Sequence, residues 1–157
     1  MDKLIEIIVN NPRLSLEDLA AMLDETKEEV AKRLDELKDN GTIRGFRTLV
    51  DWTKLDVNKV NSIILLNVRP VKDAGFDEVA KKIANMDEVE SVLLMSGGYD
   101  LLVEISGDSF QSIAEFVAKR LSPMDSVLST STHFVLKTYK RDNSLYIEDD
   151  KDYRIDA

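Results

Sequence analysis

The chain has 157 residues, of which 43% are apolar and 32% charged, with a formal net charge of −9, no cysteine and one histidine. That composition is typical of a globular protein with room for one ordinary domain or two small ones. It excludes disulfides, a His/Cys zinc site within one chain and a Cys–His catalytic pair. Neither a run of about 20 apolar residues nor an N-terminal export signal is present, so we expect a cytoplasmic, non-membrane protein that is not an enzyme and uses no cofactor.

The negative charge is spread over the whole chain. Residues 1–58 carry 9 Lys/Arg against 13 Asp/Glu, residues 59–140 carry 9 against 11, and residues 141–157 carry 3 against 6. Because contact with phosphate drives nucleic-acid affinity, any such binding must come from a local patch of cations.

The first 40 residues show three short helical patterns. The first helix is expected to end before Asn11-Pro12, and Ser15 and Thr26 are expected to cap the second and third. Thr26 and Glu29 form a capping box, and Gly41 stands where a left-handed helix end would fall. The helical spacing places these apolar residues in three buried stripes: Leu4, Ile5, Ile7 and Ile8; Leu16, Leu19, Ala20 and Leu23; Val30, Leu34 and Leu37.

Residues 42–50 are rich in β-branched and aromatic side chains, which predicts a strand that Gly45 can bend. Three helices with a tight turn between the last two, followed by a β-wing, define a winged helix-turn-helix over residues 1–50. Residues 51–58 are interpreted as a linker, and Trp52 is interpreted as a packing residue that fixes the two domains.

From residue 59 the pattern changes to β-α-β-β-α-β. This order predicts a ferredoxin-like α+β domain over residues 59–140, an antiparallel sheet with both helices on one face. The expected strands are 59–68, 89–95, 99–106 and 126–138, and the expected helices are 76–86 and a second one that Ser109 or Asp108 caps and that stops at Pro123.

The first of these strands is apolar on both sides, with Ile64, Leu66 and Val68 on one and Ile63 and Leu65 on the other. A sheet face open to water normally alternates apolar and polar residues, so we expect a second copy to cover it in a homodimer. Residues 141–157 are acidic and are interpreted as a solvated tail.

Four stretches together resemble the Lrp/AsnC family of transcription regulators: 11–20, 41–46, 96–103 and 129–136. The resemblance covers about residues 3–140 and implies a DNA-binding helix-turn-helix and an α+β effector domain called RAM. It also implies dimers that can assemble into tetramers or octamers, and amino acids as effectors.

The third helix and the wing supply the candidate contacts to double-stranded DNA: Lys27, Glu28, Lys32, Arg33, Arg44 and Arg47. The N-terminal residues of a recognition helix reach base edges, whereas wing cations approach phosphate. Glu28 and Glu29 depart from the basic or small polar residues usual in the family. We expect them to pair along the helix with Lys32 and Arg33, four residues on. The alternative interpretation of these six candidate residues is an ordinary solvated helix face of mixed charge with no binding role.

A turn between two strands supplies most of the candidate effector site: Met95, Ser96, Gly97, Gly98, Tyr99 and Asp100. Its glycines permit positive φ and expose backbone groups to a small zwitterion, whose ammonium Asp100 is placed to accept. Thr130 and Thr132, in a run of hydroxyls on the last strand, are added to this site. His133 has no partner for metal binding, and we interpret it as a packed or interface residue.

Two functions from different classes remain open on the sequence. The first is a DNA-binding transcription regulator that responds to a small metabolite through an oligomerising effector domain. The second is an acidic metabolite-sensing or protein-interaction module that does not bind DNA, which the charge of residues 1–58 and the Glu28-Glu29 pair favour.

Overall fold

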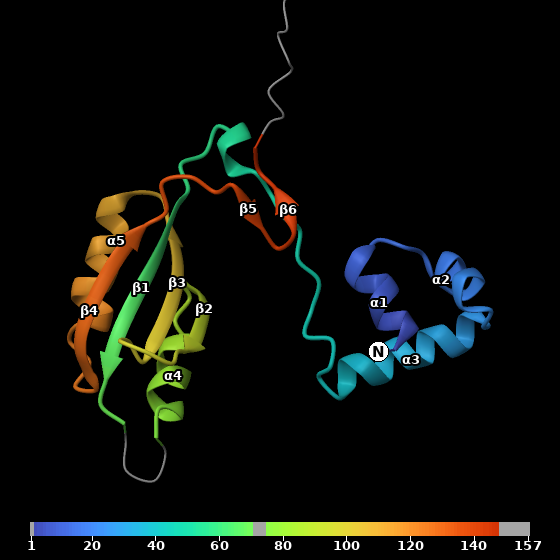
Figure 1. Ribbon diagram of the computed structural model, residues 1–157, viewed down its shortest axis with the longest axis horizontal. Coiled ribbons are helices and arrows are strands. Elements are labelled where there is room, and N and C mark those ends of the chain that lie inside the picture. Colours follow the sequence, from blue (N-terminus) through green and yellow to red (C-terminus); the bar gives the residue numbers. More distant parts are fainter. Residues whose placement is uncertain (1, 71–74, 148–157) are drawn as a thin grey trace, which may run out of the picture. The chain divides into compact units, whose positions relative to one another are not determined.

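The computed structural model describes residues 2–70 and 75–147 (Figure 1). The chain divides into two compact units, Met1–Val50 and Asp51–Ala157, and each is described by itself. Over the described residues, no helix combines the length and the apolar character that crossing a membrane requires.

The first unit contains three helices, α1 (Lys3–Asn10), α2 (Leu16–Leu23) and α3 (Lys27–Asp39). Their ends follow the predicted capping chemistry: Ser15 with Asp18 and Thr26 with Glu29 form complete capping boxes. Gly41 has a φ of 74°, as expected after α3. The helices close over a buried core of Leu4, Ile8, Leu19, Ala20 and Val30.

Two expectations for this unit are not met. Leu16, predicted to lie in the buried stripe of α2, is 38% exposed at the start of the helix. Residues 42–50 run without a strand, and Phe46 within them is 58% exposed. A β-branched composition favours extended backbone, but a strand also needs a neighbouring strand to pair with. None of the described residues pairs with this segment, so the β-wing is not formed by this chain alone.

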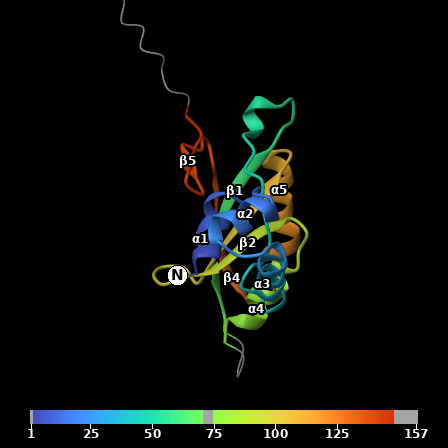
Figure 2. The same cartoon turned by 90° about the vertical axis from the view of Figure 1, so that its right-hand side faces the viewer.

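The second unit is an antiparallel sheet of order β2-β3-β1-β4, built from β1 (Val60–Val68), β2 (Val89–Leu94), β3 (Leu101–Gly107) and β4 (Val127–Phe134). Helices α4 (Asp77–Ala84) and α5 (Phe110–Phe116), the latter continued by the π-helical turn η2 (Val117–Leu121), cover one face (Figures 1 and 2). The alternating residues Ile64, Leu66 and Val68 of β1 are buried against those helices. The predicted β-α-β-β-α-β order is therefore confirmed.

The chain after β4 differs from the expected acidic tail. β4 ends at Phe134 and not at residue 138, and β5 (Lys140–Arg141) then pairs with β6 (Ser144–Leu145) in a hairpin. Asp142 and Asn143 turn the hairpin with φ values of 45° and 63°, the left-handed conformation that two-residue hairpin turns require. The predicted tail thus begins as ordered structure. Its remaining residues, 148–157, lie outside the described part.

The expected linker is also partly ordered. Its residues include a short 3-10 helix, η1 (Trp52–Lys54), and Asp51 accepts a hydrogen bond from the backbone N–H of Thr53 at 3.1 Å. Residues 51–58 belong to the second unit.

Candidate DNA-binding surface and effector site

The first two turns of α3 present two lysines to solvent. The Lys27 side chain is 52% exposed and makes an ion pair with Glu17 of α2. Lys32 is 79% exposed and lies 3.9 Å from Glu36, one turn further along the helix. Glu28 is exposed beside them. Exposed ion pairs contribute little free energy, so both ammonium groups are available to exchange a carboxylate for a phosphate.

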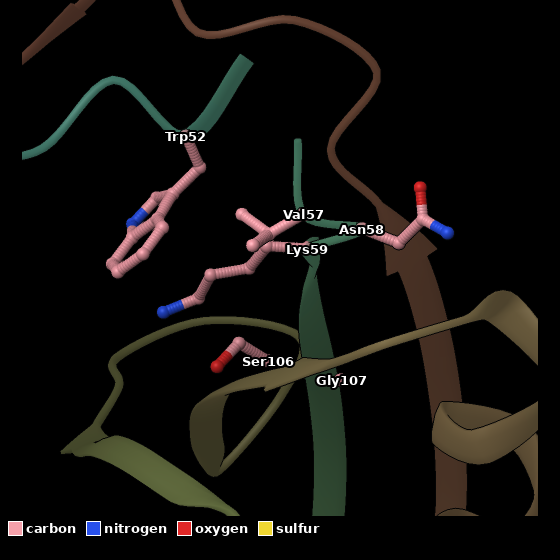
Figure 3. Close-up of a pocket in the computed structure, with 6 residues that line it drawn as sticks. All are labelled: Trp52, Val57, Asn58, Lys59, Ser106 and Gly107. Atoms are coloured by element: carbon pink, nitrogen blue, oxygen red, sulfur yellow. The ribbon is translucent and has the colours of Figure 1, made fainter. Parts of the chain in front are cut away.

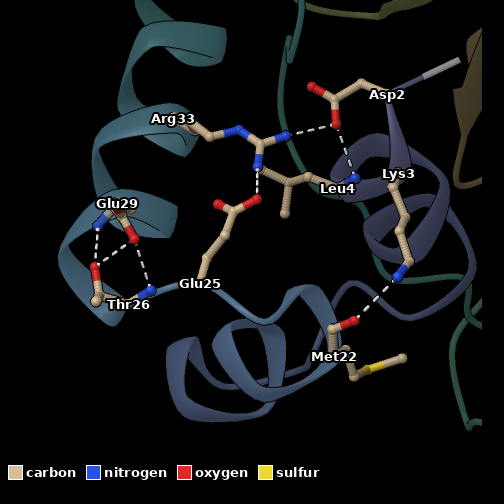
Figure 4. A network of polar contacts seen from close by, with 8 residues as sticks. All are labelled: Asp2, Lys3, Leu4, Met22, Glu25, Thr26, Glu29 and Arg33. Carbon is tan, nitrogen blue, oxygen red and sulfur yellow. Dashed lines mark hydrogen bonds and ion pairs between the residues drawn. The ribbon is translucent and has the colours of Figure 1, made fainter.

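Arg33 has a different environment, shown in Figure 4. One guanidinium nitrogen donates to Asp2, the N-cap of α1, at 2.7 Å, and the other donates to Glu25 in the turn before α3. The hydrogen bond that Arg33 donates to Glu25, followed by the one that it donates to Asp2, raises the pKa of Arg33. The pKa of Asp2 is lowered by the backbone N–H of Leu4 and then by Arg33. Arg33 therefore connects α1 to the α2–α3 turn.

The predicted pairs along α3 are wrong in both cases. Glu29 closes the capping box with Thr26, which lowers the pKa of its carboxyl, and Arg33 pairs outside the helix. Lys32 pairs with Glu36 and not with Glu28. The capping box competes directly with the helical pairing, because one carboxylate cannot reach both ends of the same turn.

The solvent face of α3 becomes acidic beyond its first turns. Beyond Lys32, the exposed side chains of the helix are three carboxylates and one lysine, which pairs with the first of them: Asp35, Glu36, Asp39 and Lys38. A surface suited to DNA is thus confined to the N-terminal half of the helix.

The two arginines of the expected wing follow α3 in the extended segment. Arg44 is exposed and its guanidinium lies over Gly41, so close that a Cβ at residue 41 would come within 3.1 Å of it. Arg47 is also exposed. Both remain candidates for phosphate contact on the same unit as Lys27 and Lys32.

The predicted effector turn joins β2 to β3. The Met95 N–H donates to the Asp100 carbonyl at 2.8 Å, and Gly97 has a φ of 130°, which only glycine adopts readily. The Asp100 carboxylate accepts from the backbone N–H of Val68 at 2.9 Å and so ties the turn to β1. All residues from Met95 to Tyr99 are exposed, whereas Asp100 is half-buried.

The two threonines added to that site lie on the helix-covered face of the sheet. Thr130 is in register with Leu66 and Thr132 with Ile64, and both threonines are half-buried. Thr130 therefore lies at the same end of the sheet as the turn, but on β4, two strands from β3 where the turn ends. Thr132 lies two residues further along β4, away from that end. Asn67, which the sequence analysis missed, shares a hydrogen bond of 3.1 Å at the same end of the sheet with Ser129, the first residue of the run of hydroxyls on the last strand. No motif singles out Asn67.

The face of the sheet that α4 and α5 leave open carries an apolar row. Leu93, Leu102 and Leu65 are in register on adjacent strands, and Ile63 lies one pleat away. Leu93 is 51% exposed and the other three are half-buried. His133, in register with Ile63, is exposed on the same face with its ring 3.0 Å from the Ser131 hydroxyl.

A helix-turn-helix joined to a ferredoxin-like domain defines a class of protein, the transcription regulator with a separate ligand-binding domain. Residues 61–145 match the Lrp/AsnC ligand binding domain family, and the chain belongs to the Lrp/AsnC family. It is similar to the HTH-type transcriptional regulator YugG of Bacillus subtilis, with 43% identity over 98% of this chain and 93% of that protein.

Two further likenesses extend over most of the chain. A proline dehydrogenase transcriptional activator of Rhizobium radiobacter is 24% identical over 88% of both proteins. The structure of the regulator NMB0573 of Neisseria meningitidis, solved as a complex with L-Met, superposes with a TM-score of 0.70 at 23% identity, over 90% of this chain and 93% of that one. The relatives are DNA-binding regulators and not enzymes, as the sequence led us to expect.

Proposed function

We propose that this protein is a cytoplasmic regulator in which the first two turns of α3 contact double-stranded DNA and the turn at residues 95–100 binds an amino acid. The observation that carries the DNA contact is the exposure of Lys27 and Lys32 on those two turns. Glu28 beside them can accept from the N4 amino group of cytosine, and Arg44 and Arg47 can reach phosphate. Arg33 is proposed to brace the unit and not to touch DNA.

The test of the DNA contact is the salt dependence of binding. A labelled duplex from upstream of the protein's own gene is titrated across KCl concentrations, where log K falls with a slope of about −0.9 per phosphate contact. Lys32→Gln should lower affinity and reduce the slope. Lys119→Gln is the matched control, because Lys119 is similarly exposed and pairs with Glu115 four residues away, but lies in the second unit. Equal effects of both variants would contradict a contact through α3, and no binding at any salt would favour the acidic module that does not bind DNA.

The effector proposal rests on the exposed backbone of Gly97 and Gly98 beside the Asp100 carboxylate. Backbone groups and a carboxylate at one turn suit a ligand with both an ammonium and a carboxylate group. The relative in complex with L-Met supports this class of ligand. Asn67, at the same end of the sheet and on its open face, is a further candidate contact, whereas Thr130 lies on the opposite, helix-covered face.

A melting panel with the twenty amino acids tests this site. A ligand that binds only the folded state stabilises it by RT ln(1 + [L]/Kd), about 2.7 kcal/mol at one hundred times Kd. Gly98→Val is the matched variant, because a Cβ at residue 98 meets no described atom within 4 Å and the fold should tolerate it. We expect one amino acid to raise the melting temperature of the natural chain but not of this variant. No shift with any amino acid at millimolar concentration would contradict the proposal.

Oligomerisation is part of the same proposal. The row of Leu93, Leu102 and Leu65 is apolar on the face that α4 and α5 leave open, and burying it against a second copy would remove it from water. A homodimer formed this way would present two DNA-binding units, and dimers can associate further into tetramers or octamers.

A further inference from the structure

A pocket of about 270 Å³ lies at the end of the sheet opposite the effector turn (Figure 3). Its lining residues come from the expected linker and from the adjoining strands: Trp52, Val57, Asn58, Lys59, Ser106 and Gly107. β3 has 7 residues between Leu101 beside the effector turn and Gly107 beside this pocket. At about 3.3 Å per residue, the two sites are roughly 20 Å apart.

The residues around this pocket are joined by polar and cation–π contacts. The Lys59 ammonium lies 4.8 Å from the centroid of the Trp52 ring and donates to Glu90 at 3.1 Å. The same Glu90 oxygen accepts from the Ser106 hydroxyl at 2.6 Å. Because Glu90 lies at a register shift between β2 and β3, its side chain is redirected from the regular alternation of the strand. The chain of contacts runs from η1 through the start of β1 to β2 and β3.

The ion pair of this cluster is partly shielded from solvent, whereas Trp52 beside it is 39% exposed. The Lys59 and Glu90 side chains are each 23% exposed, less than the other ion-paired lysines named above. Partial desolvation strengthens both a cation–π contact and an ion pair. The charges of Lys59 and Glu90 thus neutralise each other within the cluster. The cluster therefore connects residues 52–59 to the sheet and is not a binding site for a free anion or cation.

We infer that residues 51–59 form a strap fastened to the second unit, with Trp52 as a positioning residue that sets where the DNA-binding unit is tethered. The connection between the units then lies before Asp51, in residues 44–50, and not in residues 51–58. This agrees with the boundary between the two units after Val50. Ile43 marks the other end of the connection, since it packs against the core of the first unit.

Fastening shortens the tether between the two units. Residues 44–50 span at most about 25 Å when extended, whereas residues 44–58 would span about 50 Å. The effective concentration of a tethered module falls as roughly the −3/2 power of tether length. Releasing the strap should therefore weaken the second of two linked DNA contacts about threefold. This consequence rests on the proposed function, whereas the strap itself does not.

Trp52 is the only tryptophan of the chain, so intrinsic fluorescence reports the strap without a label. Lys59→Ala and Glu90→Gln should each raise the acrylamide quenching constant of Trp52 about twofold and shift its emission to longer wavelength. Lys82→Ala, which breaks the Lys82–Glu78 pair on α4, is the matched control and should change neither. Far-UV circular dichroism verifies that every variant is folded. Unchanged quenching in the folded Lys59→Ala and Glu90→Gln variants would overturn the inference that residues 51–59 form a strap.

The tether consequence is tested with DNA. Lys59→Ala, in which Trp52 quenching measures the release, should lower affinity about threefold for a duplex with two half-sites and leave affinity for one half-site unchanged. If the natural chain binds no DNA, the proposed function fails, whereas the quenching experiment still tests whether residues 51–59 are held against the second unit. An unchanged ratio of the two affinities, in a variant whose strap is shown to be released, would overturn the positioning role of Trp52.

Discussion

Arg33 shows how a charged side chain takes a role that its helical spacing does not predict. Its position four residues after Glu29 favours a pair on the surface of α3, but Glu29 closes the capping box. The guanidinium instead holds Asp2 and Glu25, two residues that precede α1 and α3 respectively. Arginine suits this place because its planar head can donate to two carboxylates at once.

We predict that Asp2→Asn destabilises the protein at pH 7 and that the difference disappears in acid. The lowered pKa of Asp2 means that its carboxylate stabilises the fold above the unfolded pKa of about 3.9, and that this contribution is lost as the pH falls through the folded value. Urea midpoints of both proteins at pH 7, 5 and 3 measure the effect. Arg33→Met should show the same convergence. A difference that stays constant with pH would contradict this account of the network.

At the scale of elements, exposed acidic residues occur along the whole length of α3. Capping and helix-dipole compensation favour glutamates in its first turn, and Asp35, Glu36 and Asp39 continue the negative face. An unfavourable surface of this kind lowers the affinity for any duplex, and it raises the relative importance of the few cations that do make contact. Affinity should therefore be low and strongly dependent on Lys27 and Lys32.

Glu36→Gln should raise DNA affinity a few-fold, because it removes a negative charge near phosphate and releases Lys32. Each such charge at about 8 Å from phosphate in water opposes binding by about 0.5 kcal/mol before salt screening. Glu115→Gln changes the net charge equally and releases Lys119 in the same way, but on α5. Fluorescence-anisotropy titrations of a labelled duplex at one salt concentration compare the DNA affinities of the two variants, and only Glu36→Gln should show the gain. Similar gains for both would show that only overall charge matters.

At the scale of the whole molecule, the proposed assembly rests on the open face of the sheet. Leu93 is 51% exposed within the apolar row, whereas Leu136, 90% exposed, lies after β4 and outside the sheet. We predict that Leu93→Glu converts a dimer into a monomer, because a charge in a buried apolar interface costs several kcal/mol. Leu136→Glu is the control with the same chemical change. Sedimentation equilibrium measures the masses, and an equal effect of both substitutions, or none, would place the interface elsewhere.

Local chemistry made much of this protein predictable from its sequence. Ser15, Thr26 and Gly41 mark the helix ends because caps act on the nearest backbone groups, and the alternation in β1 marks its buried face because successive side chains point to opposite sides. The glycine turn at residues 95–100 was found for the same reason. The order of elements, and with it the class of fold, follows from these short-range signals.

Only the tertiary structure decided the partners of residues far apart in the chain. Thr130 and Thr132 face the helices because of their register with Leu66 and Ile64, and Arg33 reaches Asp2 across 31 positions. Lys59 likewise meets Glu90 31 positions away and lies over the ring of Trp52, a residue of the expected linker. Residues 42–50 lack a strand because composition favours extended backbone, whereas only a neighbour in space completes the hydrogen bonds.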